Sequence, residues 1–143
     1  MSVAQRRFFT EVAALVGAQK VPRVKDRVEQ LRVLNTSPRD LVLGIEIKES
    51  SELIGTIGLR NIDWRQHQAE AAIFIGDSKQ WNKGYGTEAM KLILDIGFKK
   101  LDLKKIQLRV NPSNVRARHV FEKVGFREKA ADKEFIVMVK EFP

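Results

Sequence analysis

Residues 69–110 combine three patterns whose order restricts the fold more than any other feature of the chain. An apolar run, AEAAIFIG (69–76), is followed by two glycines one residue apart, and then by apolar residues at helical spacing from Met90 to Leu101. A second alternating run, KKIQLRV (104–110), comes after the helical pattern. A strand, a helix and a strand in this order predict a right-handed crossover that joins two parallel strands.

The segments on either side of this unit predict further elements. LVLGIEIK (41–48) alternates apolar residues and is followed, after a short turn, by LIGTIGL (53–59), which predicts a hairpin. After the crossover we expect a short helix that ends at Gly125, because glycine commonly follows the last turn of a helix. The run FIVMVKEF (135–142) predicts a last strand.

The pattern before residue 39 predicts helices and no strand. Residues 8–16 have the apolar spacing of a short helix, and so does a segment that starts at Pro22 and reaches residue 34. A chain of 143 residues is long enough for one domain. We therefore expect a single α/β domain with an α+β mixed sheet. Residues 1–38 would form a short helical segment, and residues 39–143 the sheet with its helices.

Composition excludes several classes of function. The chain has no cysteine and two histidines, His67 and His119, so thiolate catalysis and cysteine-bound zinc are excluded and no histidine-based metal site is expected. No apolar run is long enough for a membrane span, and no signal segment opens the chain, so we expect a cytoplasmic protein without membrane association. Lys and Arg outnumber Asp and Glu 26 to 18, a net charge of +8, which favours an anionic partner without identifying it.

Gly84 and Gly86 stand where the predicted strand is followed by the crossover helix. The first amide N–H groups of a helix lack intrahelical acceptors and carry the positive end of the helix dipole. An anion can reach these groups when side chains are absent, and Lys79 and Lys83 add positive charge nearby. The stretch QWNKGYGTEAM (80–90) therefore predicts a phosphate-binding turn, although a tight turn that needs positive φ remains an alternative on spacing alone.

Two common nucleotide-binding motifs do not fit this stretch. GYGTEA matches the dinucleotide-binding fingerprint formally, but the next strand ends in Arg109 and Val110 rather than in an acidic residue. No second strand–helix–strand unit follows. A P-loop requires Gly-Lys-Ser or Gly-Lys-Thr, which the chain lacks.

Over a longer stretch, the chain resembles the GNAT superfamily of N-acetyltransferases. The matching elements, in order, are the hairpin ELIGTIGLRNID (52–63), the strand that ends in IGD, WNKGYGTEA (81–89), the turn with Asn114, and FEKVGF (121–126). The resemblance runs from about residue 40 to the C-terminus and is strongest over 69–127. It is closest to the branch that acetylates ribosomal-protein N-termini, spermidine and other small amines. The joint order and spacing of these matching elements are specific to the family, whereas the pair Gly84 and Gly86 alone is not.

The resemblance implies acetyl-CoA as the acyl donor and no metal. It implies that the strand at 69–76 and the strand after the crossover helix splay apart around the pantetheine arm, and that the main chain of 82–87 binds the diphosphate. Asn114 would hydrogen-bond the arm, although it also fits a plain helix N-cap. The residues assigned to coenzyme binding in this way are Phe74, Ile75, Gly76, Trp81, Asn82, Lys83, Gly84, Tyr85, Gly86, Thr87, Asn114 and Phe121.

Transfer of an acetyl group to an amine requires a base, because a lysine-like amine has a pKa of about 10.4 and is mostly protonated at neutral pH. Glu70 matches a glutamate common near the start of this strand in the family and is the candidate general base. A carboxylate that only attracts cationic acceptors is the alternative. The family's other frequent base position holds Arg109. The tyrosine that usually precedes EKxGF as the acid is replaced by Phe121, and Tyr85 lies in the phosphate-binding turn.

Three functions remain open from the sequence. The first is transfer of an acetyl group from acetyl-CoA to a primary amine of a small molecule or a protein N-terminus, by direct attack in a ternary complex. The second is a catalytically weak or inactive acyl-CoA-binding module. The third, binding to nucleic acid or the ribosome, depends on charge alone; no RNA-binding motif supports it, so no specific nucleic acid binding is expected. A missing first strand would leave an unpaired sheet edge and favour a homodimer.

Overall fold

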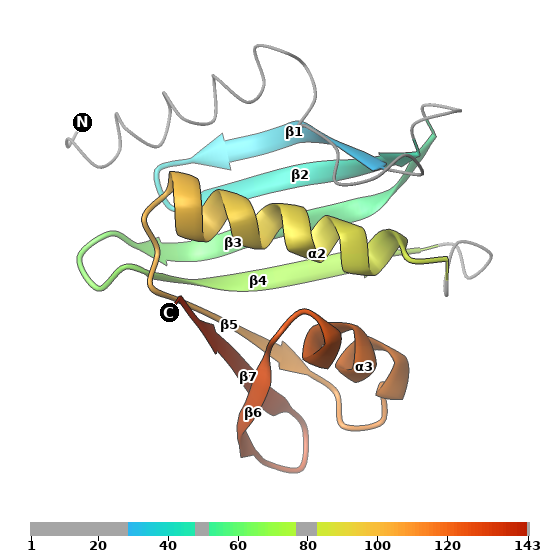
Figure 1. Ribbon diagram of the computed structural model, residues 1–143, viewed down its shortest axis with the longest axis vertical. Helices are drawn as coiled ribbons and strands as arrows, with labels where there is room; N and C mark the ends of the chain where they lie inside the picture. Colours follow the sequence, from blue (N-terminus) through green and yellow to red (C-terminus); the bar gives the residue numbers. More distant parts are fainter. Residues whose placement is uncertain (1–28, 48–51, 77–82, 143) are drawn as a thin grey trace.

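The computed structural model describes residues 29–47, 52–76 and 83–142, which form a seven-stranded mixed sheet with the strand order β1-β2-β3-β4-β5-β7-β6 (Figure 1). The strands are β1 (Glu29–Ser37), β2 (Asp40–Ile47), β3 (Leu53–Asp63), β4 (Gln68–Ile75), β5 (Lys105–Val110), β6 (Arg127–Ala131) and β7 (Ile136–Glu141). The helices are α2 (Tyr85–Asp95), its π-helical continuation η2 (Ile96–Lys100), and α3 (Val115–Lys123). The mixed α+β architecture expected from the sequence is confirmed.

The pairing of the strands confirms both predicted supersecondary units. β2 and β3 form the predicted antiparallel hairpin, and β4 and β5 are parallel, joined by α2 and η2. α3 ends as expected, since Gly125 follows it with φ 104°, a left-handed conformation that glycine adopts without strain. The two described helices contact each other.

β1 corrects the prediction for the first part of the chain. The spacing of Val24, Val28 and Leu31 predicts a helix up to residue 34, yet Glu29–Ser37 form a strand that pairs antiparallel with β2 along its length. Long-range pairing with a complete strand outweighs apolar spacing over about two helical turns. The expectation that no strand precedes residue 39 is therefore wrong, and β1 occupies the edge beside β2. The helix predicted at 8–16 lies outside the described residues.

β6 is a strand that the sequence analysis does not predict. All of its residues, from Arg127 to Ala131, are exposed, so no apolar alternation marks it. The strand is held by antiparallel pairing with β7. A strand without a buried face gives no hydrophobic signal.

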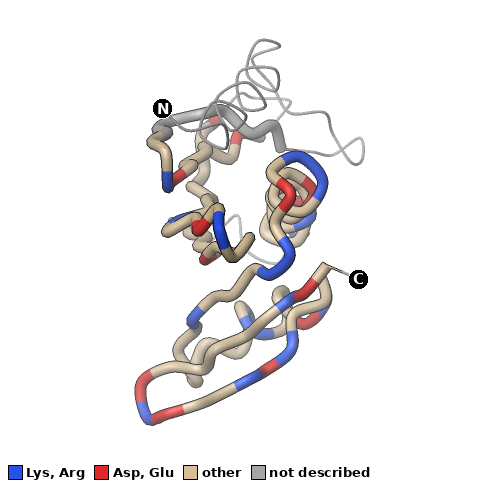
Figure 2. The backbone as a smooth tube through the Cα atoms, turned by 90° about the vertical axis from the view of Figure 1, so that its left-hand side faces the viewer, with Lys and Arg blue, Asp and Glu red and all other residues tan. Residues whose placement is uncertain are grey.

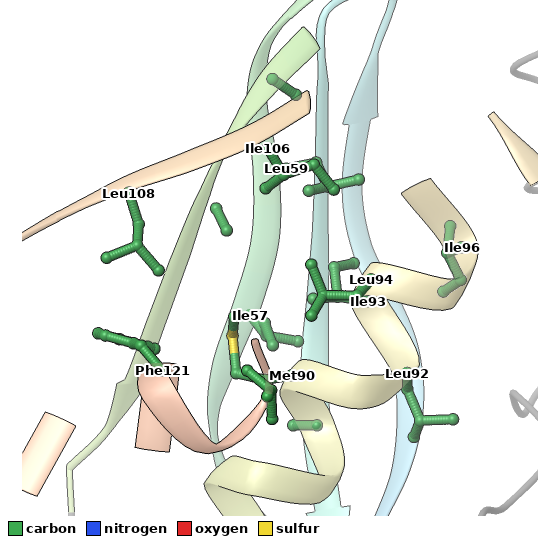
Figure 3. Close-up of a cluster of buried hydrophobic side chains, with 14 of the residues drawn as sticks. Ile57, Leu59, Met90, Leu92, Ile93, Leu94, Ile96, Ile106, Leu108 and Phe121 are labelled. Carbon is green, nitrogen blue, oxygen red and sulfur yellow. The ribbon is translucent and has the colours of Figure 1, made fainter. Parts of the chain in front are cut away.

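The core lies between the sheet and α2. Met90 and Ile93 of α2 are fully buried, and Met90 lies close to Ile57 of β3 (Figure 3). Where the helix continues as η2, a Cβ on Gly97 would approach the Cδ1 atom of Ile106 within 2.8 Å. This contact explains the glycine in the predicted apolar stripe, because a larger side chain would push the helix away from β5.

Candidate active site

β4 and β5 pair at only three positions, which join Gln68 to Lys105, Ala69 to Ile106, and Glu70 to Gln107. Beyond Glu70, β4 remains paired with β3 and β5 remains paired with β7, but the two parallel strands diverge (Figure 1). A cavity of about 240 Å³ lies in the gap, lined by residues of both strands, α2 and α3. The splayed strands that the resemblance implies are therefore present.

A larger groove of about 590 Å³ lies between the end of β4, the start of α2, and α3. Seven of the residues assigned to coenzyme binding line it together: Phe74, Ile75, Gly84, Gly86, Thr87, Asn114 and Phe121. Three others, Gly76, Lys83 and Tyr85, are described but are not among the lining residues. Trp81 and Asn82 lie outside the described residues.

Glycine is present at positions 84 and 86, at the start of α2, for different structural reasons. Gly84 is the N-cap and has φ 90°, so the alternative of a turn that needs positive φ is correct at this position. Gly86 lies in the first turn, where an added Cβ would meet side-chain carbons of Ile73, Ile75 and Val120 at 3.9–4.0 Å, which are ordinary contacts. Packing does not require glycine there. Its missing side chain leaves the groove open beside the first amides of the helix.

Among the described residues, no side chain caps the start of α2. The first intrahelical bond is donated by the amide of Glu88 to the carbonyl of Gly84 at 3.0 Å, so the preceding amides of the turn lack acceptors within the helix. They lie at the positive end of the helix dipole and beside the groove. This arrangement can bind a phosphate group.

Asn114 both caps α3 and lines the groove. Its Oδ1 atom accepts a hydrogen bond from the amide of Ala117 at 3.2 Å, so the N-cap alternative is structurally correct. The turn before it is held by Arg118, whose Nη1 atom donates to the carbonyl of Pro112 at 3.4 Å and whose Nη2 atom lies 4.0 Å from Glu128. Arg118 therefore links this turn to β6.

Phe121 lies where the groove meets the gap between the strands, because it lines both cavities. The side chain is 6% exposed, and its ring packs edge-on against Phe126 with centroids 6.1 Å apart. No hydroxyl is present at this position. Tyr85 is partly buried against the hydrophobic core. Arg109, in the alternative base position, places its guanidinium 5.6 Å from the ring of Phe135.

Glu70, the candidate base, is not among the residues that line the groove. Its Oε2 atom accepts a hydrogen bond from Nδ2 of Asn61 at 3.1 Å. Strand alternation places Glu70 and Phe74 on the same face of β4, about 13 Å apart along the strand. Glu70 is the last residue of β4 that pairs with β5, so it stands where the gap begins.

Three groove residues were missed by the sequence analysis: Arg116, His119 and Lys123 of α3. The apolar periodicity of the sequence predicts only the buried stripe of this helix. Their spacing of three and then four residues, which places them on one helix face, was the available signal.

Comparison with known proteins identifies the family. The acetyltransferase (GNAT) domain family matches residues 5–127. The chain belongs to the GNAT acetyltransferase family. This GNAT chain is 27% identical over 115 residues to the uncharacterised N-acetyltransferase p20 of Bacillus licheniformis. The aligned region covers 80% of this chain and 64% of that relative. It is 39% identical over 75 residues to spermidine N(1)-acetyltransferase of Escherichia coli K12. This aligned region covers 52% of the chain and 40% of that relative.

A solved GNAT structure has the same fold. Spermidine N-acetyltransferase from Vibrio cholerae, in complex with CoA and spermine, aligns with a TM-score of 0.65 and 26% identity, over 72% of this chain and 66% of that chain. The GNAT fold expected from the resemblance is confirmed. The chain spans less than two thirds of the length of p20 and of the E. coli enzyme.

The described part of the chain has no group of three or more His, Asp or Glu side chains that could hold a metal ion. Within the same residues, no helix is both long and apolar enough to cross a membrane.

Proposed function

We propose that this GNAT chain transfers an acetyl group from acetyl-CoA to a primary amine of a small molecule or of a protein N-terminus, by direct attack in a ternary complex. The supporting observation is one continuous path through the molecule. The groove begins at the uncapped first turn of α2 and reaches Phe121, which also lines the gap between β4 and β5. A long ligand with a phosphate at one end and a reactive group at the other fits this path.

The residues along the path have properties that suit each part of acetyl-CoA. The amides between Gly84 and Thr87 would hold the diphosphate. Between Ala71 and Phe74, no described strand pairs with the side of β4 that faces β5, so the backbone groups of this stretch can pair with the two amides of the pantetheine arm. Asn114 would donate from Nδ2, because its Oδ1 atom already accepts from Ala117. The thioester supplies the acetyl group.

The chain's own residues would then manage the protons. Glu70 would accept the proton that the amine loses as its nitrogen bonds to the carbonyl carbon. Glu70 stands where the gap between β4 and β5 begins, and the transfer would be direct or through a water molecule. The carbon–sulfur bond breaks, and the sulfur leaves as a thiolate. Phe121 cannot supply a proton, but a thiol with a pKa of about 8.5 leaves readily without one.

The amine would approach from the face of β4 that carries Glu70 and Phe74. A hollow of about 320 Å³ on this side is lined by Phe74 and by Asp40 and Arg60 of the neighbouring strands. Carboxylates such as Asp40 and Glu70 attract ammonium groups. An amine acceptor is also consistent with the E. coli relative, which is named for spermidine.

A weak or inactive acyl-CoA-binding module is the second candidate. It is favoured by Phe121, which places a ring without a hydroxyl at the junction of groove and gap. Nucleic acid binding gains no support from Figure 2, in which Lys and Arg positions and Asp and Glu positions are both spread along the described chain.

Self-association is part of the proposal. The first strand, whose absence was the basis for expecting a homodimer, is present and pairs with β2; among the described residues, β1 is the terminal strand of the sheet and could pair with a second chain. One V. cholerae spermidine N-acetyltransferase structure is described as dodecameric. Sizing chromatography with light scattering should give a mass of at least two chains, and a strictly monomeric mass would contradict this part.

Two measurements on the full chain test the proposed function. Saturating acetyl-CoA should raise the melting temperature, since a ligand at 100 times its Kd stabilises the folded state by about 2.7 kcal/mol. A panel of primary amines, with detection of free thiol, should show release that depends on the amine. Stabilisation without release selects the binding module. No stabilisation by acetyl-CoA contradicts both candidates.

A further inference from the structure

One wall of the groove carries three basic side chains. Arg116, His119 and Lys123 of α3 all line it and are all exposed. Residues at i, i+3 and i+7 share one face of a helix, so the three side chains form a row along the wall. We call this row the basic ridge.

The basic ridge makes its wall cationic. Among the described residues that line the groove, none is acidic, and the basic ridge supplies all the charged side chains. Arginine keeps its charge at any ordinary pH, and its planar group binds phosphate oxygens in pairs. A cavity with charges of one sign raises the local concentration of an anion.

The basic ridge lies close to the phosphate-binding start of α2. A Cβ placed on Gly86 would be 4.0 Å from Cγ1 of Val120, and Val120 is the residue after His119 and one turn beyond Arg116. The two helices also contact each other directly. The groove therefore offers two features that bind anions on facing walls: main-chain amides on α2 and basic side chains on α3.

Two such features suit a ligand with two separate phosphate groups. A single diphosphate at the start of α2 would contact the amides of one wall only. Coenzyme A carries a further phosphate on the 3′-oxygen of its ribose, one sugar away from the diphosphate. This group is a dianion near neutral pH and is the part of the coenzyme that best matches a row of cations.

Building on the proposed function, we infer that the basic ridge binds the ribose 3′-phosphate of the coenzyme. The chain would then discriminate CoA from 3′-dephospho-CoA, which is identical except for this phosphate. The start of α2 would fix the diphosphate, and the basic ridge would fix the nucleoside end. Removal of the 3′-phosphate should weaken binding about tenfold, as expected for the loss of charge-assisted hydrogen bonds.

Equilibrium binding of CoA and 3′-dephospho-CoA to the full chain tests this inference. The wild type should bind CoA about tenfold more tightly, and rising salt should reduce this preference. The double variant Arg116→Gln/Lys123→Gln should lose the preference while it retains its affinity for dephospho-CoA. A matched control, Lys91→Gln/Lys100→Gln, removes two exposed charges from α2 and η2 and should keep the preference.

Each contrary result has a separate meaning. If the wild type binds both compounds equally, the inference is overturned and the proposed function stands. If the double variant keeps the preference, or weakens both compounds equally, the basic ridge does not recognise the 3′-phosphate and the inference is overturned. If the wild type binds neither compound, the proposed function fails and the inference fails with it.

Discussion

The Oδ1 atom of Asn114 accepts a hydrogen bond from the amide of Ala117 at 3.2 Å, and this contact determines which half of the Asn114 side chain can meet a ligand. The oxygen is committed to the helix cap. The Nδ2 group, which can only donate, is left for the groove. The two roles can therefore be separated by substitution.

Asn114→Asp should keep the cap and lose the donor. Aspartate caps helices as well as asparagine, so the melting temperature should hardly change. Acetyl-CoA binding, measured by calorimetry, should weaken about tenfold, because a carboxylate cannot donate to the pantetheine arm. Asn114→Ala serves as the control and should also lose about 1 kcal/mol of stability. Unchanged affinity in Asn114→Asp would remove Asn114 from the binding site.

The glycines at the start of α2 should respond in opposite ways. Gly84→Ala should destabilise the fold by about 1 kcal/mol, because φ 90° is strained for alanine. Gly86→Ala should leave stability unchanged or slightly raised, since its Cβ meets only ordinary contacts. The same methyl group should weaken acetyl-CoA binding. Thermal melts with and without the coenzyme measure both effects, and full binding by Gly86→Ala would contradict the proposed diphosphate site.

Phe121→Tyr should raise the acetylation rate by about tenfold or more, because general acids contribute about 10²–10⁴-fold where they are needed. The added hydroxyl would stand where groove and gap meet. Thiol release under saturating substrates is the measurement. Phe135→Tyr adds the same hydroxyl at a half-exposed position outside these cavities and should change nothing. An unchanged rate in Phe121→Tyr would mean that the thiolate leaves without an acid.

Glu70→Gln should lower kcat about 100-fold and leave the Kd for acetyl-CoA unchanged. Glutamine can still accept the hydrogen bond from Asn61, so the fold should be retained. Glu122→Gln, an exposed substitution on α3, is the control. Full activity in Glu70→Gln would leave Glu70 as an attractor of cations at most.

Lys129 destabilises the charged form of Lys105. The two ammonium groups interact directly and lower the pKa of Lys105, an effect that Glu141 partly offsets. Below its folded pKa, a lysine whose pKa is lowered by folding reduces the free energy of unfolding. This destabilisation decreases as the pH rises from the folded pKa to the unfolded pKa, and it is absent above the unfolded pKa. Lys129→Gln should therefore raise the melting temperature at pH 7. The gain should shrink in 1 M salt, where the screening length is about 3 Å, and above pH 10.5.

A control separates this repulsion from net charge. Lys133→Gln removes an exposed charge from the loop between β6 and β7 and should have a smaller effect. An equal rise in melting temperature in both variants would show that stability depends only on the net charge of the protein.

The helices and strands with a clear hydrophobic periodicity could be predicted from the sequence, and the elements without such a periodicity could not. The hairpin of β2 and β3 and the crossover from β4 to β5 each bury an apolar face, so their alternation is visible. β6 buries no face and gives no signal. Residues 29–34 fit one turn of helical spacing, and only pairing with β2 determines that they form a strand.

The site follows the same division. Gly84, Gly86, Asn114 and Phe121 belong to a motif with fixed spacing, and they line one groove. The basic ridge could not be assigned in this way, because its role depends on how close α3 lies to the start of α2. That distance is set by the packing of Val120 near Gly86 and not by any local pattern.

The three-residue pairing between β4 and β5 has a consequence for how the protein opens. It joins one block, β1 to β4, to a second block formed by β5, β6 and β7. A molecule bound between the two blocks of strands would contact both blocks and oppose their separation. Deuterium uptake by the amides of β5 should therefore slow when the wedge-shaped space is filled.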